Sequence, residues 1–150
     1  MKRKPLAVSL LISLGTGGIA GFLTSGSMEK YQEMYHPPLS PPGWVFPIAW
    51  LILYTLMGIA AYRIYMKNPK AESLKLYLIQ LAVNFLWPII FFNLGWQLFA
   101  AVWILLLWYL VFVLIKEFAR IDRGAAKLLI PYLIWLTFAA YLNIVIALHR

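Results

Sequence analysis

Residues 76–115 read LYLIQLAVNFLWPIIFFNLGWQLFAAVWILLLWYLVFVLI, which is 40 consecutive residues without Asp, Glu, Lys or Arg. A helix needs about 20 predominantly apolar residues to cross the hydrocarbon core of a bilayer, so this stretch is long enough for two crossings. Its middle, FNLGWQ at 92–97, contains an Asn and a Gly at which a helix can end. We therefore predict two successive membrane helices, at 74–93 and 97–116.

Three further windows contain no charged residue, and they lie at 5–28, 34–62 and 128–149. They predict membrane helices at 5–23, 44–66 and 127–148. All these windows are too long and too uniformly apolar for the alternating pattern of barrel strands. We expect an all-α integral membrane protein, a five-transmembrane-helix bundle that forms a single domain over residues 1–150.

The composition supports a membrane protein and excludes several other classes. Of the 150 residues, 63% are hydrophobic and 12% are charged, whereas a soluble domain carries about 25% charged residues. The aromatic content of 17% is incompatible with a disordered chain. The absence of cysteine excludes a disulfide scaffold, thiolate metal ligands and a cysteine nucleophile.

Basic residues mark one side of the predicted bundle. With five spans, 11 of the 13 Lys and Arg residues fall on the side of the N-terminus, and only Lys30 and Arg150 fall on the other. The positive-inside rule then places the N-terminus in the cytoplasm. The net charge of +8 is mainly this topological signal, and no soluble basic surface is present for nucleic acid.

The N-terminal sequence bears on processing and on the membrane in question. The basic residues before the first window would also suit a signal peptide, but no small-residue cleavage site follows and the apolar stretch is longer than a usual signal core. No arginine-rich transit segment is visible. We expect that the first helix is not cleaved and that the protein resides in the cytoplasmic membrane of a bacterium.

Two local patterns each have two interpretations. Gly17 and Gly21 form a G-x-x-x-G pattern in the first span, which suits close helix packing inside the bundle or a dimer seam. The proline-rich segment 36–47 reads HPPLSPPGWVFP and cannot be helical where the prolines cluster. It predicts either a rigid lead into the second helix or a lid over a cavity.

Polar and aromatic side chains recur at helical spacing within three of the spans. Taken alone, each set of such residues can be explained by packing between helices. Together, three helices that each carry such a stripe favour a partly polar pocket for a large flat aromatic ligand. The stripes are Trp50 and Tyr54 in the second span, Gln80, Asn84 and Trp87 in the third, and Trp135, Ala139 and Asn143 in the fifth.

The sequence offers little for acid–base or metal chemistry. All five acidic residues fall in loops or at helix ends, so no carboxylate pair, nucleophile–base pair or metal site is predicted within the membrane. The same lack of intramembrane charge argues against ion-coupled transport, although passage of a neutral solute stays open. His36 is a minor candidate for an axial ligand to a haem-like molecule.

Several motifs resemble those of one known family. The segments SPPGWVFP at 40–47 followed by Trp50, QLAVNFLW at 80–87 and RIDR at 120–123 are similar to those of the tryptophan-rich sensory protein (TspO/MBR) family. LIPYLIW at 129–135 and FAAYLN at 138–143 continue the resemblance through the last span. This is the family of the translocator protein, or peripheral benzodiazepine receptor, and the match covers nearly the whole chain in order.

The resemblance implies a membrane receptor or sensor that is often a homodimer. Such proteins bind porphyrins such as protoporphyrin IX, and also isoquinoline carboxamides, in a pocket within the bundle. Some bacterial members are reported to degrade protoporphyrin under light and oxygen, so enzymatic activity is left open. The porphyrin would be ligand or substrate rather than a tightly bound cofactor, and the main alternative is a carrier for porphyrin or another hydrophobic molecule.

The resemblance also implies roles for particular residues. Trp50 and Trp135 match the pocket tryptophans and would be electron donors or quenchers for a light-excited ligand, because light absorption itself belongs to the tetrapyrrole. The other ligand-binding residues that the resemblance implies are Tyr31, Pro42, Tyr54, Gln80, Asn84, Trp87 and Ala139, and Asn143 is expected from its spacing in the fifth span.

Some positions depart from the family pattern. Lys30 precedes Tyr31 where Trp-Tyr is frequent, and His36 and Leu39 replace a lysine and an aromatic residue. Tyr141 lies nine residues from Arg150, so the cholesterol motif of animal members is absent and cholesterol is not an expected partner.

Overall fold

The computed structural model describes residues 2–27 and 44–149. Five helical segments in these ranges are long and apolar enough to cross a membrane, and no strand occurs in them. They are α1 (Arg3–Thr24, extended by a short 3-10 turn, η1, Ser25–Ser27), α3 (Val45–Lys67), α4 (Glu72–Pro88) continued by a π-helical turn, η2 (Ile89–Asn93), α5 (Gln97–Ile121), and α6 (Arg123–Leu128) followed by α7 (Ile130–Leu148). The predicted five-span, all-α fold is confirmed.

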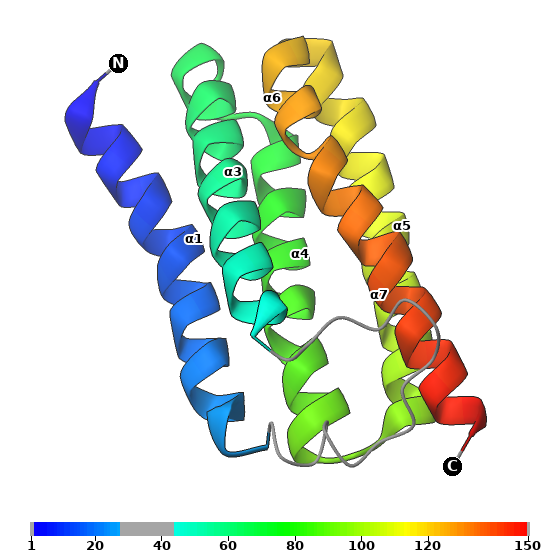
Figure 1. Ribbon diagram of the computed structural model, residues 1–150. Helices are drawn as coiled ribbons and strands as arrows, with labels where there is room; N and C mark the ends of the chain where they lie inside the picture. Colours follow the sequence, from blue (N-terminus) through cyan, green and yellow to red (C-terminus); the bar gives the residue numbers. More distant parts are fainter. Residues whose placement is uncertain (1, 28–43, 150) are drawn as a thin grey trace.

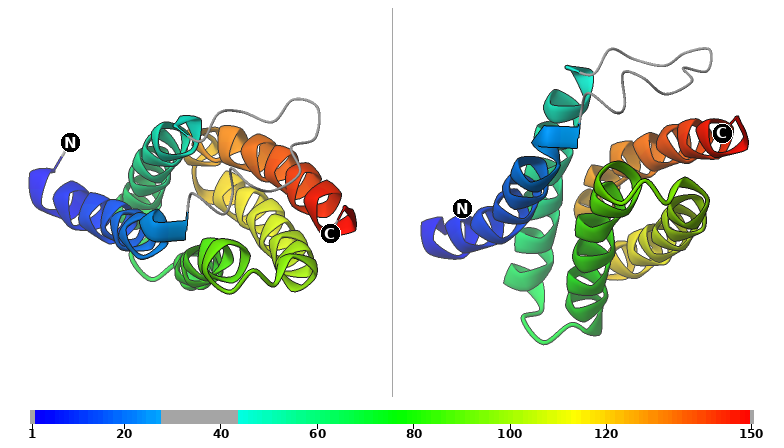
Figure 2. Two further views of the ribbon diagram at one scale, coloured as in Figure 1. Left: turned by 60° about the horizontal axis from the view of Figure 1, so that its bottom comes forward. Right: turned by 90° about the horizontal axis from the view of Figure 1, so that it is seen from below.

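The helices run up and down beside one another (Figure 1). The N-terminus, the α3–α4 connection and the α5–α6 connection lie at one end of the bundle, which we call the basic end because it carries the clusters 2–4, 63–75 and 116–127. The C-terminus and the start of α3 lie at the opposite end. The views in Figure 2 show α1 at one side of the bundle and α5 and α7 at the other, with α3 and α4 between them.

The packed centre is formed by α3, α4, α5 and α7. Met57, Ile64, Ile104, Leu107 and Leu136 are almost completely buried there. In contrast, α1 buries only Ser13, Ala20 and Thr24, and large apolar side chains cover its outer face. Such residues are suited to contact with lipid, as expected for a transmembrane helix at the edge of a bundle.

Proline explains two features of the helices that the predicted spans did not contain. Pro88 lies within the third span, where it lacks the N–H that an α-helix requires, and the chain continues as the π turn η2, closed by a bond from Leu94 N to Ile89 O of 3.0 Å. Pro131 stands in the first turn of α7, so the last span is divided into α6 and α7 at Leu129.

The turn between the third and fourth spans is where the sequence predicted it. Gly95 has a φ of +67°, which a residue with a side chain adopts only with strain, and the chain then enters α5 at Gln97. The amide Nδ2 of Asn93 donates to the carbonyl oxygen of Leu23 at 3.0 Å, which ties this turn to the end of α1.

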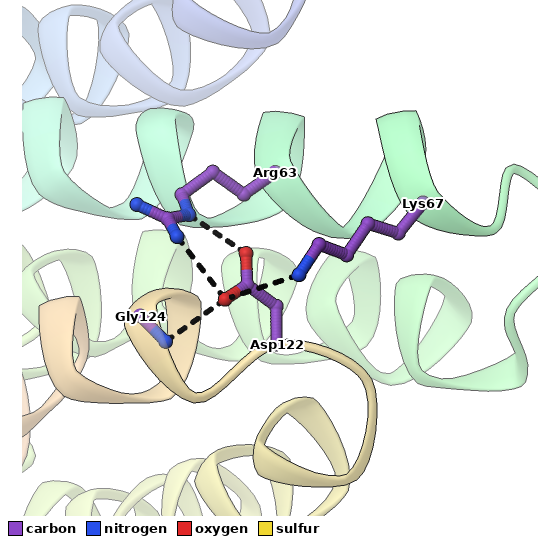
Figure 3. A network of polar contacts seen from close by, with 4 residues as sticks. All are labelled: Arg63, Lys67, Asp122 and Gly124. Atoms are coloured by element: carbon purple, nitrogen blue, oxygen red, sulfur yellow. Dashed lines mark hydrogen bonds and ion pairs between the residues drawn. The ribbon is translucent and has the colours of Figure 1, made fainter.

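An ion-pair network joins α3 to the α5–α6 connection at the basic end (Figure 3). Arg63 donates from Nε to Oδ2 of Asp122 at 2.7 Å and from Nη2 to Oδ1 at 3.1 Å, and Lys67 Nζ lies 3.6 Å from Oδ1. Asp122 also caps α6 by accepting from the N–H of Gly124 at 2.9 Å. A Cβ at Gly124 would collide with the Arg63 guanidinium, so glycine permits this approach.

Candidate ligand-binding pocket

A cavity of about 410 Å³ opens between α1, α3 and the α4–η2 junction, toward the end opposite the basic end. Its walls include Gly18 and Gly21 of α1, Trp50 and Tyr54 of α3, and Asn84 of α4. The other lining residues are Leu14, Gly17, Ala20, Thr24, Ser25, Phe46, Pro47, Leu51, Pro88 and Phe92. The volume is within the range of small-molecule pockets, about 300–1,000 Å³.

The glycines of α1 have different surroundings. A Cβ at Gly17 would overlap the ring of Tyr54, so Gly17 serves close packing of α1 on α3. At Gly18 and Gly21 an added Cβ would meet nothing within 4 Å, and both residues line the cavity. Within the G-x-x-x-G pattern, Gly17 therefore serves helix packing and Gly21 leaves room in the cavity. The alternative role of this pattern in a dimer seam stays a prediction.

Buried hydrogen bonds connect the cavity wall to the bundle centre. Asn84 accepts at Oδ1 from the hydroxyl of Tyr54 at 2.5 Å and donates from Nδ2 to the hydroxyl of Tyr132 at 2.6 Å. Tyr132 donates in turn to Oε1 of Gln80 at 2.8 Å, and Gln80 Nε2 contacts Met57 Sδ at 3.8 Å. One amide hydrogen and further lone pairs of Asn84 are left for a ligand.

The two tryptophans expected in the pocket are neighbours. The ring centroids of Trp50 and Trp135 are 6.1 Å apart in an edge-to-face arrangement, and Trp50 also lies 5.7 Å from Tyr54. Only Trp50 lines the cavity; Trp135 lines a separate shallow groove between α3 and α7 with Leu53, Ile134 and others. The indole N–H of Trp135 is buried and has no hydrogen-bond partner among the described residues.

Three other expected ligand residues form a packed joint. Trp87 donates from Nε1 to Oδ1 of Asn143 at 2.9 Å, and Asn143 donates from Nδ2 to the carbonyl oxygen of Gln97 at 2.8 Å. Ala139 lies beside them, and the space that they border with Phe91 and other residues is only about 10 Å³. A space of this size holds no more than one water molecule. In this structure the three residues therefore connect α4, α5 and α7 by packing and hydrogen bonds rather than line a ligand cavity.

The structure thus places the expected residues in three groups. Trp50, Tyr54 and Asn84 line the cavity, Trp135 supports Trp50 from behind, and the remaining described ones lie away from the cavity: Gln80, Trp87, Ala139 and Asn143. Tyr31, Pro42 and His36 lie outside the described residues.

Sequence reasoning missed several residues of the site. The α1 wall was missed because a glycine pattern suits packing equally well, although Gly17, Gly18 and Gly21 do share one helix face. Tyr132 was also missed, and its signal was its position three residues before Trp135, on the same side of the helix.

No described part of the cavity wall carries a formal charge, and no three acidic or histidine residues come together within residues 2–27 and 44–149. The arrangement is suited to hold an apolar, flat molecule by contact and a single amide. It defines a multi-pass, all-α membrane protein with an aromatic pocket inside the bundle.

Comparison with known sequences gives the family. The sequence model described as the TspO/MBR family matches residues 7–149, and the chain belongs to this family. It is 34% identical to the tryptophan-rich protein TspO of Chlorobaculum tepidum, covering 94% of this chain and 91% of that protein. It is 36% identical to the tryptophan-rich sensory protein of Cereibacter sphaeroides (92% and 87%) and 32% identical to the human translocator protein (92% and 85%).

Proposed function

We propose that this membrane protein is a receptor for a porphyrin-type tetrapyrrole, which it binds in the cavity between α1, α3 and α4. The observation that carries the proposal is the wall itself: the half-buried ring of Trp50 beside the amide of Asn84 in a cavity of about 410 Å³. A flat aromatic ligand would stack on Trp50, which contributes about 0.5–1.5 kcal/mol beyond burial of area. The free hydrogen of the Asn84 amide would bond a polar edge of the ligand.

The names of the relatives agree with this proposal. A sensory protein and a translocator protein are among them, and both names suit a chain that binds a small molecule within the bundle. Isoquinoline carboxamides would occupy the same cavity, because they too combine flat rings with a polar amide. The membrane would be the cytoplasmic membrane of a bacterium, with the basic end inside and the protein working as a homodimer.

Light- and oxygen-dependent degradation of the bound porphyrin is a second candidate function. It is favoured by the distance of 6.1 Å between the rings of Trp50 and Trp135, over which the two rings could share an electron vacancy. Trp50 would donate one electron to the excited ligand, which passes it to molecular oxygen as superoxide. A second electron from the ligand would then restore the tryptophans, and the porphyrin radical cation would combine with superoxide, so that the net reaction is addition of O2 to the porphyrin. Molecular oxygen would be the oxidant, and light would be absorbed by the tetrapyrrole.

The test is a titration of the purified protein with protoporphyrin IX, followed by tryptophan quenching in the dark. Gly18→Leu should abolish saturable binding, because its side chain would extend into the cavity from a position where an added Cβ meets nothing within 4 Å. Gly15→Leu is the matched control: a Cβ there also meets nothing within 4 Å, but Gly15 does not line the cavity. Equal binding by both variants would place the porphyrin elsewhere and refute this site.

The tryptophans are tested in the same titration. Trp50→Phe should weaken binding more than Trp135→Phe, since only Trp50 lines the cavity, and the exposed Trp96→Phe should leave it unchanged. Illumination then separates the functions: loss of porphyrin absorbance to a defined product, slowed in both Trp50→Phe and Trp135→Phe, would support degradation. Binding without a product supports the receptor, and porphyrin flux across proteoliposomes would instead support the carrier.

A further inference from the structure

The first helix lies at one side of the bundle (Figure 2) and is held to α3 unequally along its length. In the half nearer the basic end, Ser9 donates to the carbonyl oxygen of Gly58 at 2.7 Å, and Ser13 donates to that of Tyr54 at 2.5 Å. A Cβ at Gly58 would lie 2.9 Å from the side chain of Leu10, so the two helices also approach closely here. This half of α1 is fixed to α3.

Residues 18–24, which we call the outer part of α1, are held differently. Within the described ranges, no hydrogen bond joins the outer part to α3. The bond that links it to another element comes from Asn93 of η2, whose Nδ2 donates to the carbonyl oxygen of Leu23 at 3.0 Å. The outer part is therefore attached near its end, to η2, and not along its length to α3.

The porphyrin cavity lies where the bonds between α1 and α3 stop. Gly18, Gly21 and Thr24 line it from the outer part of α1, and Leu51 lines it from α3. Gly18 and Gly21 are exposed, and Leu51 is 60% exposed. Because exposed residues of two adjacent membrane helices form part of its wall, the cavity reaches the lipid-facing surface between α1 and α3.

The segment that joins the two parts of α1 has a sequence that bends readily. Residues 16–18 are Thr-Gly-Gly. The hydroxyl of Thr16 donates to the carbonyl oxygen of Ile12 at 2.7 Å, and bonds of this kind to the preceding turn weaken and bend helices. Glycine is less favourable than alanine in a helix interior. Bending should therefore be easier at this segment than elsewhere in α1.

We propose that the outer part of α1 is a gate through which the ligand passes between the bilayer and the porphyrin cavity. The gate turns on residues 16–18, and the bond from Asn93 to Leu23 is its latch. A flat apolar ligand partitions into the bilayer, so an opening that faces lipid lies on its path. The gate rests on the proposed function, because it serves the same cavity and the same class of ligand.

A reversible cross-link tests the latch. Since the chain has no cysteine, Leu23→Cys and Asn93→Cys can be joined by a short bifunctional thiol reagent that a reductant cleaves. Protoporphyrin IX is bound in the dark, and its transfer to excess lipid vesicles is followed by the recovery of tryptophan fluorescence. The cross-link should slow transfer about tenfold, which corresponds to a barrier higher by about 1.4 kcal/mol. Cleavage should restore the rate.

The affinity separates a gate from damage to the cavity. The Kd for protoporphyrin IX should be the same with the cross-link closed and cleaved, because entry and release cross the same barrier. Before the reagent is added, the double variant lacks the latch and should transfer porphyrin faster than the unaltered protein.

Lys2→Cys with Met66→Cys is the matched control for the cross-link. Both residues are exposed and border one hollow at the basic end. The same reagent would there join the start of α1 to the end of α3, in the half that is already fixed. This link should leave the transfer rate unchanged, and mass spectrometry confirms that each link has formed.

Thr16→Ala tests the hinge. It should slow transfer about threefold, because the helix propensities of threonine and alanine differ by up to about 0.7 kcal/mol. Thr55→Ala is the matched control, since Thr55 makes the same kind of bond within α3, to the carbonyl oxygen of Leu51 at 2.8 Å. Neither threonine lines the cavity.

The outcomes distinguish the gate from the proposed function. A protein that binds no protoporphyrin IX in the dark overturns both. If binding is saturable, the gate alone is overturned by equal transfer rates with the link between positions 23 and 93 closed and cleaved, or by equal slowing from both cross-links. Equal rates in Thr16→Ala and Thr55→Ala would contradict the hinge.

Discussion

At the scale of single residues, the hydroxyl of Tyr132 is the centre of the buried polar network. It accepts from Asn84 at 2.6 Å and donates to Gln80 at 2.8 Å, and the side chain is completely buried. This one atom joins α7 to two successive turns of α4. Asn84 in turn holds Tyr54, so the orientation of the cavity wall depends on a residue that does not line it.

We expect Tyr132→Phe to destabilise the protein by about 1–2 kcal/mol, because Gln80 and Asn84 each lose a partner within the membrane. Tyr54→Phe removes one hydrogen bond and should cost less. Reversible unfolding in mixed micelles measures both changes. A Tyr132→Phe protein as stable as the unaltered one would show that water or a rearrangement replaces these bonds.

At the scale of the helices, the pair Arg63–Asp122 fixes the position of α3 against α6. Hydrogen bonds from Arg63 are the main reason why the pKa of Asp122 is lowered from 3.8 to about 2, and the bond from Gly124 and the charges of Arg63 and Lys67 act in the same direction against the effect of burial. The Asp122 side chain is only 5% exposed, whereas that of Arg63 is 45% exposed, so solvent screens the attraction in part.

The lowered pKa gives this pair a defined pH dependence. Its stabilisation is fully present above the ordinary pKa of 3.8 and is lost as the pH falls through about 2, where the carboxylate takes up a proton. After the discount for screening, we expect about 1 kcal/mol. Melting temperatures in detergent between pH 2 and 7 measure this contribution.

Asp122→Asn should melt lower at neutral pH and lose this part of the acid sensitivity. Glu72→Gln removes an exposed carboxylate from a surface pair and serves as the control. An acid sensitivity that is the same in Asp122→Asn as in the unaltered protein would contradict the assignment to this pair.

The five membrane helices were predictable from the sequence, and the three details that differ each have a cause in nearby residues. Length and hydropathy suffice for five spans, and the Asn-Leu-Gly sequence at 93–95 suffices for the tightest turn. The division at Leu129 and the π turn after Pro88 were not predicted, because a membrane window ignores where a proline falls within it. The fourth span extends beyond 116 to Ile121, since charged residues at the basic end remain helical; Glu117 and Arg120 even pair there at 3.7 Å.

The candidate site was predictable only in part. Trp50, Tyr54 and Asn84 were found from spacing and resemblance, and they do line one cavity. Trp87 and Asn143 have the same kind of pattern, yet they bond each other. Spacing shows which side chains share a helix face, but only the packing of helices decides whether a cavity or a neighbour lies opposite.

At the scale of the whole molecule, charge and hydropathy define two different ends. The basic end carries the connections α3–α4 and α5–α6 (Figure 1), while the cavity between α1, α3 and the α4–η2 junction lies toward the other end. The positive-inside rule predicts that this cavity is nearer the outer face of the membrane.

Because the chain has no cysteine, single cysteines can report its orientation. We expect an impermeant maleimide to label Leu94→Cys in intact cells, and to label Lys70→Cys only after the membrane is permeabilised. Both positions are exposed. Leu94 is in the connection from η2 to α5 and Lys70 in the connection from α3 to α4, and these connections lie at opposite ends of the bundle. The reverse labelling pattern would place the N-terminus outside.

The π turn at Ile89–Asn93 restricts how the length of this segment can vary. It accommodates one residue more than an α-helix would, and the buried Ile90, Phe91 and Phe92 are consecutive, without a lipid-facing residue between them. Removal of that extra residue would return the segment to α-helical register with the flanking residues in place, whereas insertion of one more residue before Phe92 would rotate the residues after it by about 100°. Such an insertion would take Phe92 out of the cavity wall and Asn93 away from the carbonyl of Leu23, so a deletion should be tolerated here more readily than an insertion.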